Sequence, residues 1–410
     1  MPTSETCPVC GVRCFIKFLN LGSSPAANNL ASNGDASIGL PRFPLALKYC
    51  DNCLYAKLSE TVNPKYLFTN YSYLTGISDE TVSHFNELFN RVVKSGVLRD
   101  THARVVDVGS NDGTLLRFFK TNGFEVIGVE PSKNVSEKAN GNGIPTINSF
   151  FDVGTLRFIK RKFGSVDLVT MTNVLTHVEH PNEMIKNAKS VINENGVIVA
   201  EFYYFRKIME NLAFDQIYHE HVSYFMFRNF CAMTKSIGLD VFDVQFTESQ
   251  GGSLRVWLCK TGKREIKGSV GAFFDQEGSR EEILAKYLVF SENVYILIEK
   301  IKAFVNKTKK SGKSIAGYGA SAKATTLVNV CSLDSSSIDF VVDANVLKQG
   351  RFIPGTNIPV CDFELFNVKK PEIIIIFAWN IWKELLSNLK TNLQYSPEFY
   401  ILVPSIRSIK

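Results

Sequence analysis

Long apolar runs are missing from this sequence. The longest uninterrupted run extends only from Ile373 to Trp379, whereas a helix that spans a bilayer needs about 20 apolar residues. The first residues are polar and contain no apolar signal segment. We therefore expect a soluble, cytoplasmic protein that has no membrane partner.

A strong excess of one charge is missing as well. The formal net charge is +6 over 410 residues, and the densest basic stretch, Lys307 to Lys313, falls where a helix is expected to end and where cations are stabilised by the helix dipole. No nucleic-acid partner is expected. The length exceeds the size at which a single hydrophobic core stops growing, so the sequence predicts two or three domains.

Histidine is scarce, with six in the chain, yet two of them occur in the stretch Tyr218-His-Glu-His221. In an extended or loop backbone, alternation places Tyr218 and Glu220 on one side and His219 and His221 on the other. A zinc-protease motif needs two histidines four residues apart on a helix, and these are two apart. The group suits acid/base chemistry; the alternative is a set of structural side chains in a half-buried strand.

Cysteine occurs nine times, an odd number that does not favour a set of disulfides. Four of the nine form two Cys-x-x-Cys pairs, Cys7 with Cys10 and Cys50 with Cys53. Each pair has the turn form that directs two thiolates at one ion, so together they predict a closed, structural zinc site. Cys14 is an alternative for one of the ligands.

The segment from Leu21 to Pro44 separates the two cysteine pairs. It is rich in Gly, Ser, Pro and Asn and has little apolar material. We therefore expect the metal to supply much of the stability of this N-terminal module.

A buried strand from Arg104 runs into a glycine-containing loop, Asp107-Val-Gly-Ser-Asn-Asp-Gly113, and then into a helix. The next strand ends in Glu130, where a carboxylate can accept both hydroxyls of a ribose. Acidic and amide groups around the glycines favour a cationic or zwitterionic nucleoside over a pyrophosphate. These features predict an S-adenosylmethionine site that contains Asp107, Gly109, Asn111, Asp112 and Glu130.

Strands and helices then alternate as in a doubly wound sheet, which a reversed hairpin from Val241 to Cys259 completes. Phe150 and Phe151 follow the third strand, where an adenine can rest against an aromatic ring. Asn173 and His177 follow the fourth, at the carboxyl edge where such sheets bind ligands. Upstream, Tyr71 and Tyr73 share one face of a short segment that either lines a cleft or covers a core.

A second strand, glycine loop and helix begins near Ser314. Its Gly317-x-Gly319-x-x-Ala322 pattern with Asp343 resembles a phosphate-binding loop. The segment from Lys348 to Thr356 is either a phosphate clamp or a solvated turn. The candidate substrate-binding residues of this domain are Tyr318, Lys323, Lys348, Arg351 and Asn380.

Taken together, these motifs resemble those of the three-part sugar C-methyltransferases over essentially the whole chain. The motifs that carry the resemblance are the cysteine pairs, Asp107 to Gly113, Asn173 to His177, Tyr218 to His221, Gly251 to Arg255, Gly317 to Lys323 and Lys348 to Gly355. Ser321 is one departure from the family pattern and bears only on loop rigidity.

The resemblance implies a zinc-binding first domain, a middle domain that binds S-adenosylmethionine, and a last, Rossmann-like domain that helps to hold the substrate without using NAD. Members of the family methylate carbon 3 of dTDP- or GDP-linked 4-keto-deoxysugars. The resemblance also places at the active site Tyr218, Glu220, His221, His177 and one of Tyr71 and Tyr73.

The chemistry agrees with these residues. Methylation next to a ketone needs a base that removes a proton, donors that hold the enolate oxygen, and a sulfonium in line. We assign His221 as the base, and Tyr218 and His177 as donors. Glu220 fixes a histidine tautomer or holds a sugar hydroxyl, and His219 is structural.

The predicted protein is an α/β monomer with three parts: a small zinc-binding module over residues 1–75, a Rossmann-like class I methyltransferase domain over residues 76–260, and a Rossmann-like sugar-nucleotide-binding domain over residues 261–410. Two alternatives remain. One is an NAD-dependent keto-sugar oxidoreductase that uses the Gly317 loop, and the other is a non-catalytic protein that binds zinc and a nucleotide sugar.

Overall fold

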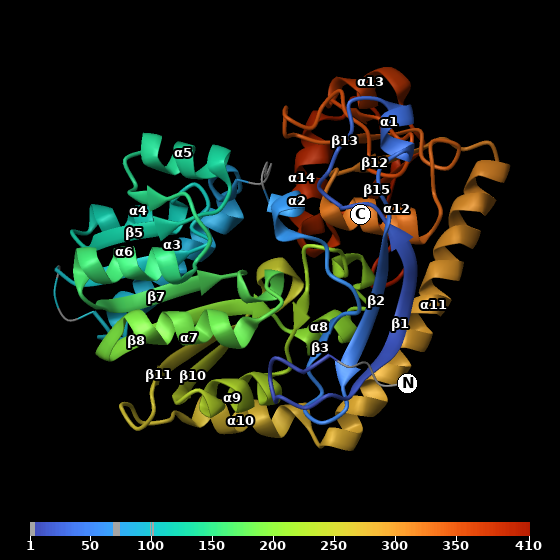
Figure 1. The fold of residues 1–410 in the computed structure, drawn as a ribbon. Coiled ribbons are helices and arrows are strands. Elements are labelled where there is room, and N and C mark those ends of the chain that lie inside the picture. Colours follow the sequence, from blue (N-terminus) through green and yellow to red (C-terminus); the bar gives the residue numbers. More distant parts are fainter. Residues whose placement is uncertain (1–4, 69–73, 99, 101) are drawn as a thin grey trace.

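The computed structural model describes residues 5–68, 74–98, 100 and 102–410. Tyr71 and Tyr73 lie outside these residues. Within the described part, the chain forms three β-sheets with helices around them (Figure 1), which confirms the α/β class. No helix in this part is long and apolar enough to cross a membrane.

The N-terminal sheet has four strands in the order β1-β2-β3-β9. Its members are β1 (Phe15–Ser24), β2 (Phe43–Cys50), β3 (Ala56–Leu58) and β9 (Ser223–Tyr224). All three pairings are antiparallel. The last strand comes from the middle of the chain, directly after the Tyr218–His221 stretch, so the N-terminal module is completed by a segment that lies far away in sequence.

The segment between the cysteine pairs is not a loop that depends on metal alone. Its short helix α1 (Gly34–Ile38) lies against the C-terminal domain (Figure 1), where the Ser37 hydroxyl donates to the Ile353 carbonyl over 2.7 Å. Phe18 and Tyr49, from the strands on either side, pack against Tyr287 with ring centroids 5.2 and 5.7 Å away. Apolar burial against the C-terminal domain therefore also stabilises the module, and the expectation that the metal supplies much of its stability stays a prediction.

The central sheet has seven strands in the order β10-β11-β8-β7-β4-β5-β6. These are β4 (Arg104–Val108), β5 (Glu125–Val129), β6 (Thr146–Ile147), β7 (Val166–Thr172), β8 (Ile192–Tyr203), β10 (Leu239–Thr247) and β11 (Ser253–Lys260). The strands from β4 to β8 pair in parallel, and β10 and β11 form the antiparallel hairpin that the sequence predicted.

Helices cover both faces of the central sheet, because successive strand residues point to opposite sides. Val105 belongs to a core that includes α3 and α4, whereas Val106 belongs to the core on the other face, with α6, α7 and α9. The helices are α2 (Pro64–Phe68), α3 (Asp79–Lys94), α4 (Thr114–Thr121), α5 (Lys133–Gly141), α6 (Val153–Phe163), α7 (Pro181–Val191), α8 (Phe205–Glu210) and α9 (Phe227–Ser236). The Ser78 side chain caps α3, accepting from the Thr81 N–H over 3.3 Å.

The C-terminal sheet has six strands in the order β14-β13-β12-β15-β16-β17, all parallel except the last. They are β12 (Ile315–Tyr318), β13 (Phe340–Val342), β14 (Val360–Cys361), β15 (Ile373–Ile376), β16 (Glu398–Ile401) and β17 (Arg407–Ile409). The associated helices are α10 (Gly268–Glu277), α11 (Arg280–Lys310), α12 (Ala322–Val330), α13 (Glu364–Lys369) and α14 (Trp382–Asn392). The long helix α11 runs beside β1 and β2 up to this domain (Figure 1), so it ties the first and last parts of the chain together.

Candidate active site

A cavity of about 1430 Å³ lies between the central and C-terminal sheets. One wall is formed by the carboxyl ends of the central strands, and the other by residues from the start of α12 and from the segments after β13 and β15. Cavities that hold one drug-sized ligand measure about 300–1,000 Å³. This cavity is therefore large enough for two ligands side by side, as a group transfer requires.

The glycine loop after β4 forms one end of the cavity. Gly109 has φ +68°, and a Cβ atom on it would lie 2.6 Å from Cγ2 of Val174, so only glycine fits here. The Asp107 carboxylate accepts from the Thr170 hydroxyl over 2.7 Å. Burial raises the pKa of Asp107 to about 7. Asp107 and Gly109 both line the cavity, as predicted.

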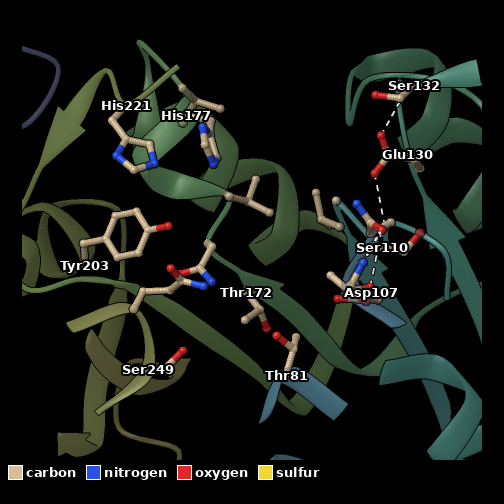
Figure 2. Close-up of a pocket in the computed structure, with 18 of the residues that line it drawn as sticks. Thr81, Asp107, Ser110, Glu130, Ser132, Thr172, His177, Tyr203, His221 and Ser249 are labelled. Carbon is tan, nitrogen blue, oxygen red and sulfur yellow. Dashed lines mark hydrogen bonds between the residues drawn. The ribbon is translucent and has the colours of Figure 1, made fainter. Parts of the chain in front are cut away.

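Glu130 lies at the same end, just after β5. Its two carboxylate oxygens accept from the backbone N–H groups of Asn111, over 3.1 Å, and Ser132, over 2.8 Å (Figure 2). Burial raises the pKa of this carboxyl group. These two bonds hold the carboxylate in the cavity wall, where it retains lone pairs for hydroxyl groups of a ligand.

Three further residues of the predicted cofactor site line the cavity. Phe151 is buried and Phe150 is 42% exposed. Asn173 has a positive φ of 58°, and its buried side-chain oxygen has no hydrogen-bond partner within the described part of the chain. A strained backbone and an unpaired buried acceptor at a strand end are typical of a ligand-binding position.

Asp112 has a different role from the one predicted. Its carboxylate accepts from the hydroxyls of Thr75 and Thr114, both over 2.6 Å, and from the Gly76 N–H over 2.9 Å. It does not line the cavity. Asp112 therefore anchors the segment before α3 to the glycine loop.

The Tyr218–His221 stretch forms a tight turn at the opposite end of the cavity. The His221 N–H donates to the Tyr218 carbonyl over 2.8 Å, and this bond closes the turn. It brings the Tyr218 hydroxyl to 2.6 Å from His221 Nε2 and the two ring centroids to 3.8 Å. The predicted alternation is wrong, because a turn places these two residues on one side where an extended strand would separate them.

Hydrogen bonds define the tautomer of His221. Its Nδ1 lies 2.7 Å from the Gln216 carbonyl oxygen, which only accepts, so Nδ1 carries the proton and Nε2 accepts from the Tyr218 hydroxyl. Burial, and to a smaller degree the neighbouring His177, lower the pKa of His221 well below its ordinary value. His221 is therefore a neutral imidazole at physiological pH, with its basic nitrogen toward Tyr218.

His177 lies beside His221, with ring centroids 5.1 Å apart (Figure 2). Its Nδ1 donates to the Glu220 carbonyl over 2.6 Å, and burial lowers its pKa. His177 also lines the cavity, as predicted from its position after the fourth strand.

The two remaining residues of the turn are not among those that line the cavity. Glu220 is buried and accepts from the Asn28 side chain over 3.0 Å, and burial raises its pKa. His219 Nε2 donates to the carbonyls of Phe43 and Pro44 over 3.2 and 3.3 Å. His219 is thus structural, as expected, and Glu220 binds the N-terminal module and is not among the residues that line the cavity.

The C-terminal domain supplies Lys323, Lys348 and Asn380 to the cavity, whereas Tyr318 and Arg351 do not line it. Lys323 Nζ donates to the Asn380 side-chain oxygen over 2.5 Å. Lys348 Nζ lies 3.2 Å from the Asp343 carboxylate. Two of the five predicted substrate residues are therefore directed elsewhere: Tyr318 is buried, and Arg351 is exposed at the surface.

The second glycine loop is held by contacts within the C-terminal domain. A Cβ atom on Gly317 would lie 2.4 Å from the Phe377 ring, so a side chain already fills the space beside this glycine. Asp343, at the expected ribose-binding position, accepts from the N–H groups of Ala320 and Asn345, both over 2.8 Å. Ser321, the departure from the family pattern, caps α12 by accepting from the Ala324 N–H over 3.3 Å.

Sequence reasoning missed Tyr203 and Asn28, which also line the cavity. The Tyr203 ring centroid is 4.6 Å from that of His221 (Figure 2). Tyr203 ends β8, so the strand-end rule that identified Asn173 also applies to it. Asn28 has no such signal, because it reaches the cavity from the segment between the cysteine pairs.

The four predicted zinc ligands form one cluster. The sulfur atoms of Cys7, Cys10, Cys50 and Cys53 all lie within 4.8 Å of one another. Cys7 and Cys53 are 3.7 Å apart, and Cys10 and Cys50 are 3.5 Å apart. Tetrahedral coordination with Zn–S bonds near 2.3 Å gives S···S distances of about 3.8 Å, so the cluster fits a zinc ion. Cys14, 3.4 Å from Cys50, does not belong to the set.

Comparison with known proteins agrees with this arrangement. Three family models match consecutive parts of the chain: a zinc binding domain over residues 7–68, a methyltransferase domain over residues 83–244, and a C-methyltransferase C-terminal domain over residues 248–404. The thiolate cluster lies in the first matched part, and Asp107 and Glu130 lie in the second.

The C-methyltransferase NovU of Streptomyces niveus is 30% identical over 407 residues, which are 99% of this chain and 97% of that protein. The chain belongs to this family of three-part C-methyltransferases. It is an S-adenosylmethionine-dependent C-methyltransferase, and the family resemblance read from the motifs is confirmed.

Two solved structures are similar to part of the chain. Magnesium protoporphyrin IX methyltransferase from Synechocystis, with bound S-adenosylmethionine, is 14% identical with a TM-score of 0.34, and the match covers 44% of this chain and 79% of that one. A methyltransferase from Clostridium acetobutylicum is 11% identical with a TM-score of 0.35, and the match covers 43% of this chain and 91% of that one.

Proposed function

We propose that this protein transfers a methyl group from S-adenosylmethionine to carbon 3 of a nucleotide-linked 4-keto-deoxysugar, with His221 as the base that removes the carbon-3 proton. The observation that carries the proposal is the Tyr218–His221 pair, with a neutral imidazole that faces a cavity large enough for two ligands. We also place the protein in the cytoplasm, because a reducing compartment keeps the cysteines of the cluster from forming disulfides.

The methyl donor occupies the end of the cavity near β4 and β5 in this proposal. Glu130 is placed to accept the ribose hydroxyls, Phe150 and Phe151 flank the adenine, and Asp107 and Asn173 face the polar groups of the amino acid part. Bound S-adenosylmethionine supplies an electrophilic methyl group on a sulfonium. The unpaired oxygen of Asn173 and the carboxylates in this wall suit a ligand that carries positive charge.

His221 acts on the substrate at the other end. The carbon-3 proton passes to Nε2 and the electron pair of the C–H bond forms the enolate, whose oxygen derives from the 4-keto group. Once protonated, Nε2 donates to the Tyr218 oxygen, and the tyrosine O–H is then directed to the enolate oxygen. With S-adenosylmethionine bound, the enolate carbon would attack the methyl group, and the methyl–sulfur bond would break with its electron pair left on sulfur, so that S-adenosylhomocysteine leaves. The imidazolium would later release its proton to water.

The C-terminal wall holds the nucleotide part of the substrate. Lys323 and Asn380 form a hydrogen-bonded pair in the cavity wall, close to the turn that carries His221. Lys323 also faces the Trp379 ring, 5.2 Å from its centroid. An ammonium group in a low-dielectric wall suits a phosphate or an enolate oxygen.

The experiment is incubation with S-adenosylmethionine, labelled in the methyl group, and a panel of dTDP- and GDP-linked 4-keto-6-deoxysugars. NMR of the product assigns the new methyl group. Carbon 5 is the other carbon next to the ketone, so methylation there would retain the reaction class and overturn the assignment of carbon 3. Absence of labelled sugar over the whole panel would overturn the substrate class.

The base is tested by solvent deuterium exchange at carbon 3 with S-adenosylhomocysteine in place of the donor. His221→Asn should keep the fold and bind both ligands, yet lose exchange and turnover by roughly 10²–10⁴-fold. His177→Asn should retain exchange at a reduced rate. Exchange that survives in His221→Asn and disappears in His177→Asn would move the role of base to His177.

A further inference from the structure

The N-terminal sheet is continuous with the turn that carries His221. Strand β3 begins three residues after the zinc ligand Cys53 and pairs with β9, Ala56 opposite Tyr224 and Lys57 opposite Ser223. The Leu58 N–H donates to the Val222 carbonyl over 3.0 Å. The metal-binding turn and His221 are therefore joined by one stretch of paired backbone.

A buried side-chain hydrogen bond reinforces this connection. The Ser223 hydroxyl donates to the Val178 carbonyl over 2.7 Å, so it accepts from the Tyr55 hydroxyl, 2.5 Å away. Tyr55 and Ser223 are 0% and 1% exposed. Tyr55 stands two residues after Cys53 and Ser223 two residues after His221, which makes this bond a short link between the two sites.

The N-terminal module also forms hydrogen bonds with two residues of the Tyr218–His221 turn. The His219 ring donates to the carbonyls of Phe43 and Pro44, and Glu220 accepts from Asn28. All these contacts come from residues between or just after the cysteine pairs. The turn is thus fixed from the side of the N-terminal module, and Tyr218 and His221 are left to face the cavity.

We propose that the zinc-held Cys50–Cys53 turn positions the catalytic turn through Tyr55 and Ser223, so that the metal controls the rate of proton removal while ligand affinity stays unchanged. Four thiolates around one ion fix the backbone between Cys50 and Cys53. A displacement of about 1 Å at a catalytic group can cost 10²-fold in rate. The methyl donor binds to the central sheet, on other elements, so its affinity does not depend on this link.

This inference rests on the proposed role of His221. Tyr55 and Ser223 are positioning residues, since neither touches the cavity. Their expected signature is a lower kcat with unchanged KM, unchanged affinity for S-adenosylmethionine and unchanged zinc content.

The direct test compares Tyr55→Phe with Tyr224→Phe. Tyr224 is a neighbour of Ser223 in β9 and is equally buried, but its hydroxyl has no hydrogen-bond partner among the residues that the structure describes. Tyr55→Phe should lower kcat and carbon-3 exchange about tenfold, while Tyr224→Phe should leave both unchanged. Ser223→Thr, which keeps a hydroxyl, should retain more activity than Ser223→Ala.

A second readout does not require the sugar substrate. In protein labelled with ¹⁵N-histidine, the proton on Nδ1 of His221 gives a resonance that is assigned by its loss in His221→Asn. This resonance should shift or broaden in Tyr55→Phe and after zinc removal by a chelator, and should be unchanged in Tyr224→Phe. Failure of the whole sugar panel would overturn the proposed function, while this measurement would still decide the link between the metal and the turn.

Two results would overturn the inference. One is a Tyr55→Phe protein with wild-type kcat and an unshifted His221 resonance. The other is equal loss of kcat and of S-adenosylmethionine affinity in both Tyr→Phe variants, since that pattern indicates general destabilisation of the sheet.

Discussion

At the scale of single residues, we expect Lys323 to make the activity dependent on pH. Burial in the cavity wall lowers its pKa to about 8, and the carboxylates of Asp215 and Glu80 offset part of this effect. The ammonium form therefore predominates below about pH 8, and the neutral amine above it. In the proposed complex, the loss of this charge weakens binding of a substrate that carries phosphate groups.

The KM for the nucleotide sugar should accordingly be close to its lowest value at pH 7 and rise through about pH 8, where half of Lys323 is neutral. Initial rates measured over this range check the expectation. Lys323→Arg should move the rise to higher pH, because a guanidinium stays charged. Exposed Lys369 provides the control, and Lys369→Arg should behave like the wild type. A KM that rises in Lys323→Arg at the same pH as in the wild type would assign the effect to another group.

Glu130 gives a prediction for the methyl donor. Replacement by alanine removes the carboxylate that the Asn111 and Ser132 N–H groups hold in place, so S-adenosylmethionine should bind more weakly by about 1–3 kcal/mol. Isothermal titration measures this loss. Glu125→Ala, at the exposed start of the same strand, is the matched control. Equal affinities for Glu130→Ala and the control would place the ribose contact elsewhere.

At the scale of elements, a buried carboxylate joins α9 to α10. Glu277, the last residue of α10, accepts from the N–H groups of Phe227 and Arg228, over 2.5 and 2.9 Å, and from the Tyr204 hydroxyl over 2.7 Å. Phe227 and Arg228 are the first residues of α9, so no preceding helical turn supplies carbonyl groups that could accept from their N–H groups. Glu277 therefore caps α9 from a different helix, where a negative charge also complements the helix dipole.

Glu277→Ala should destabilise α9 by about 2–3 kcal/mol, because three donors, two of them buried, lose their acceptor. Hydrogen–deuterium exchange of the amides in residues 227–236 is the measurement, and it should become roughly 30- to 150-fold faster in the variant at 1.4 kcal/mol per tenfold. Asp275→Ala changes an exposed carboxylate on the same helix. Equal exchange in the two variants would contradict the capping role.

The elements themselves were predictable from local pattern. The buried strands around β4, β5 and β15 and the amphipathic α3 and α11 follow from period and capping residues that act within a few positions. The conformation of the Tyr218–His221 turn was not predictable in the same way. It depends on pairing between β9 and β3, more than 150 residues apart, and no local pattern around Tyr218 indicates that partner.

The residues of the candidate site also fall into two groups, those that local pattern indicated and those that depend on tertiary contacts. Asp107, Glu130 and Asn173 line one cavity, as expected for residues at strand ends that parallel topology brings together. The sequence did not indicate that Asp112 binds Thr75 and Gly76 instead of a ligand. These bonds depend on how the segment before α3 packs against the glycine loop, which is a tertiary contact. Asn28 was missed since its place at the cavity depends on tertiary docking alone.

At the scale of the whole molecule, the three domains share one hydrophobic core. A single cluster of buried side chains includes Leu47 of the N-terminal sheet, Phe202 of the central sheet and Ile374 of the C-terminal sheet. The segment between the cysteine pairs adds direct bonds to the C-terminal domain, where Ala31 pairs with Phe352 and Ser37 bonds to Ile353. Disruption of one domain should therefore lower the stability of the other two.

Removal of zinc tests this coupling. In a module that folds independently, chelation would create a separate transition at low temperature. In this chain, strands β1 and β2 retain their packing against α11, so the module should stay attached. Calorimetry of chelated protein should show the main transition shifted to lower temperature, with no new transition for the N-terminal part, because elements that share a core unfold together.

Two cysteine variants make the result specific to the metal. Cys50→Ser removes a ligand from the cluster and should reproduce the shift of the chelated protein without further loss on chelation. Cys14→Ser removes a thiol that neighbours Cys50 without belonging to the cluster, and it should keep one zinc ion and the wild-type melting temperature. A low-temperature transition confined to the N-terminal residues would mean that the shared core does not hold the module once the thiolates are released.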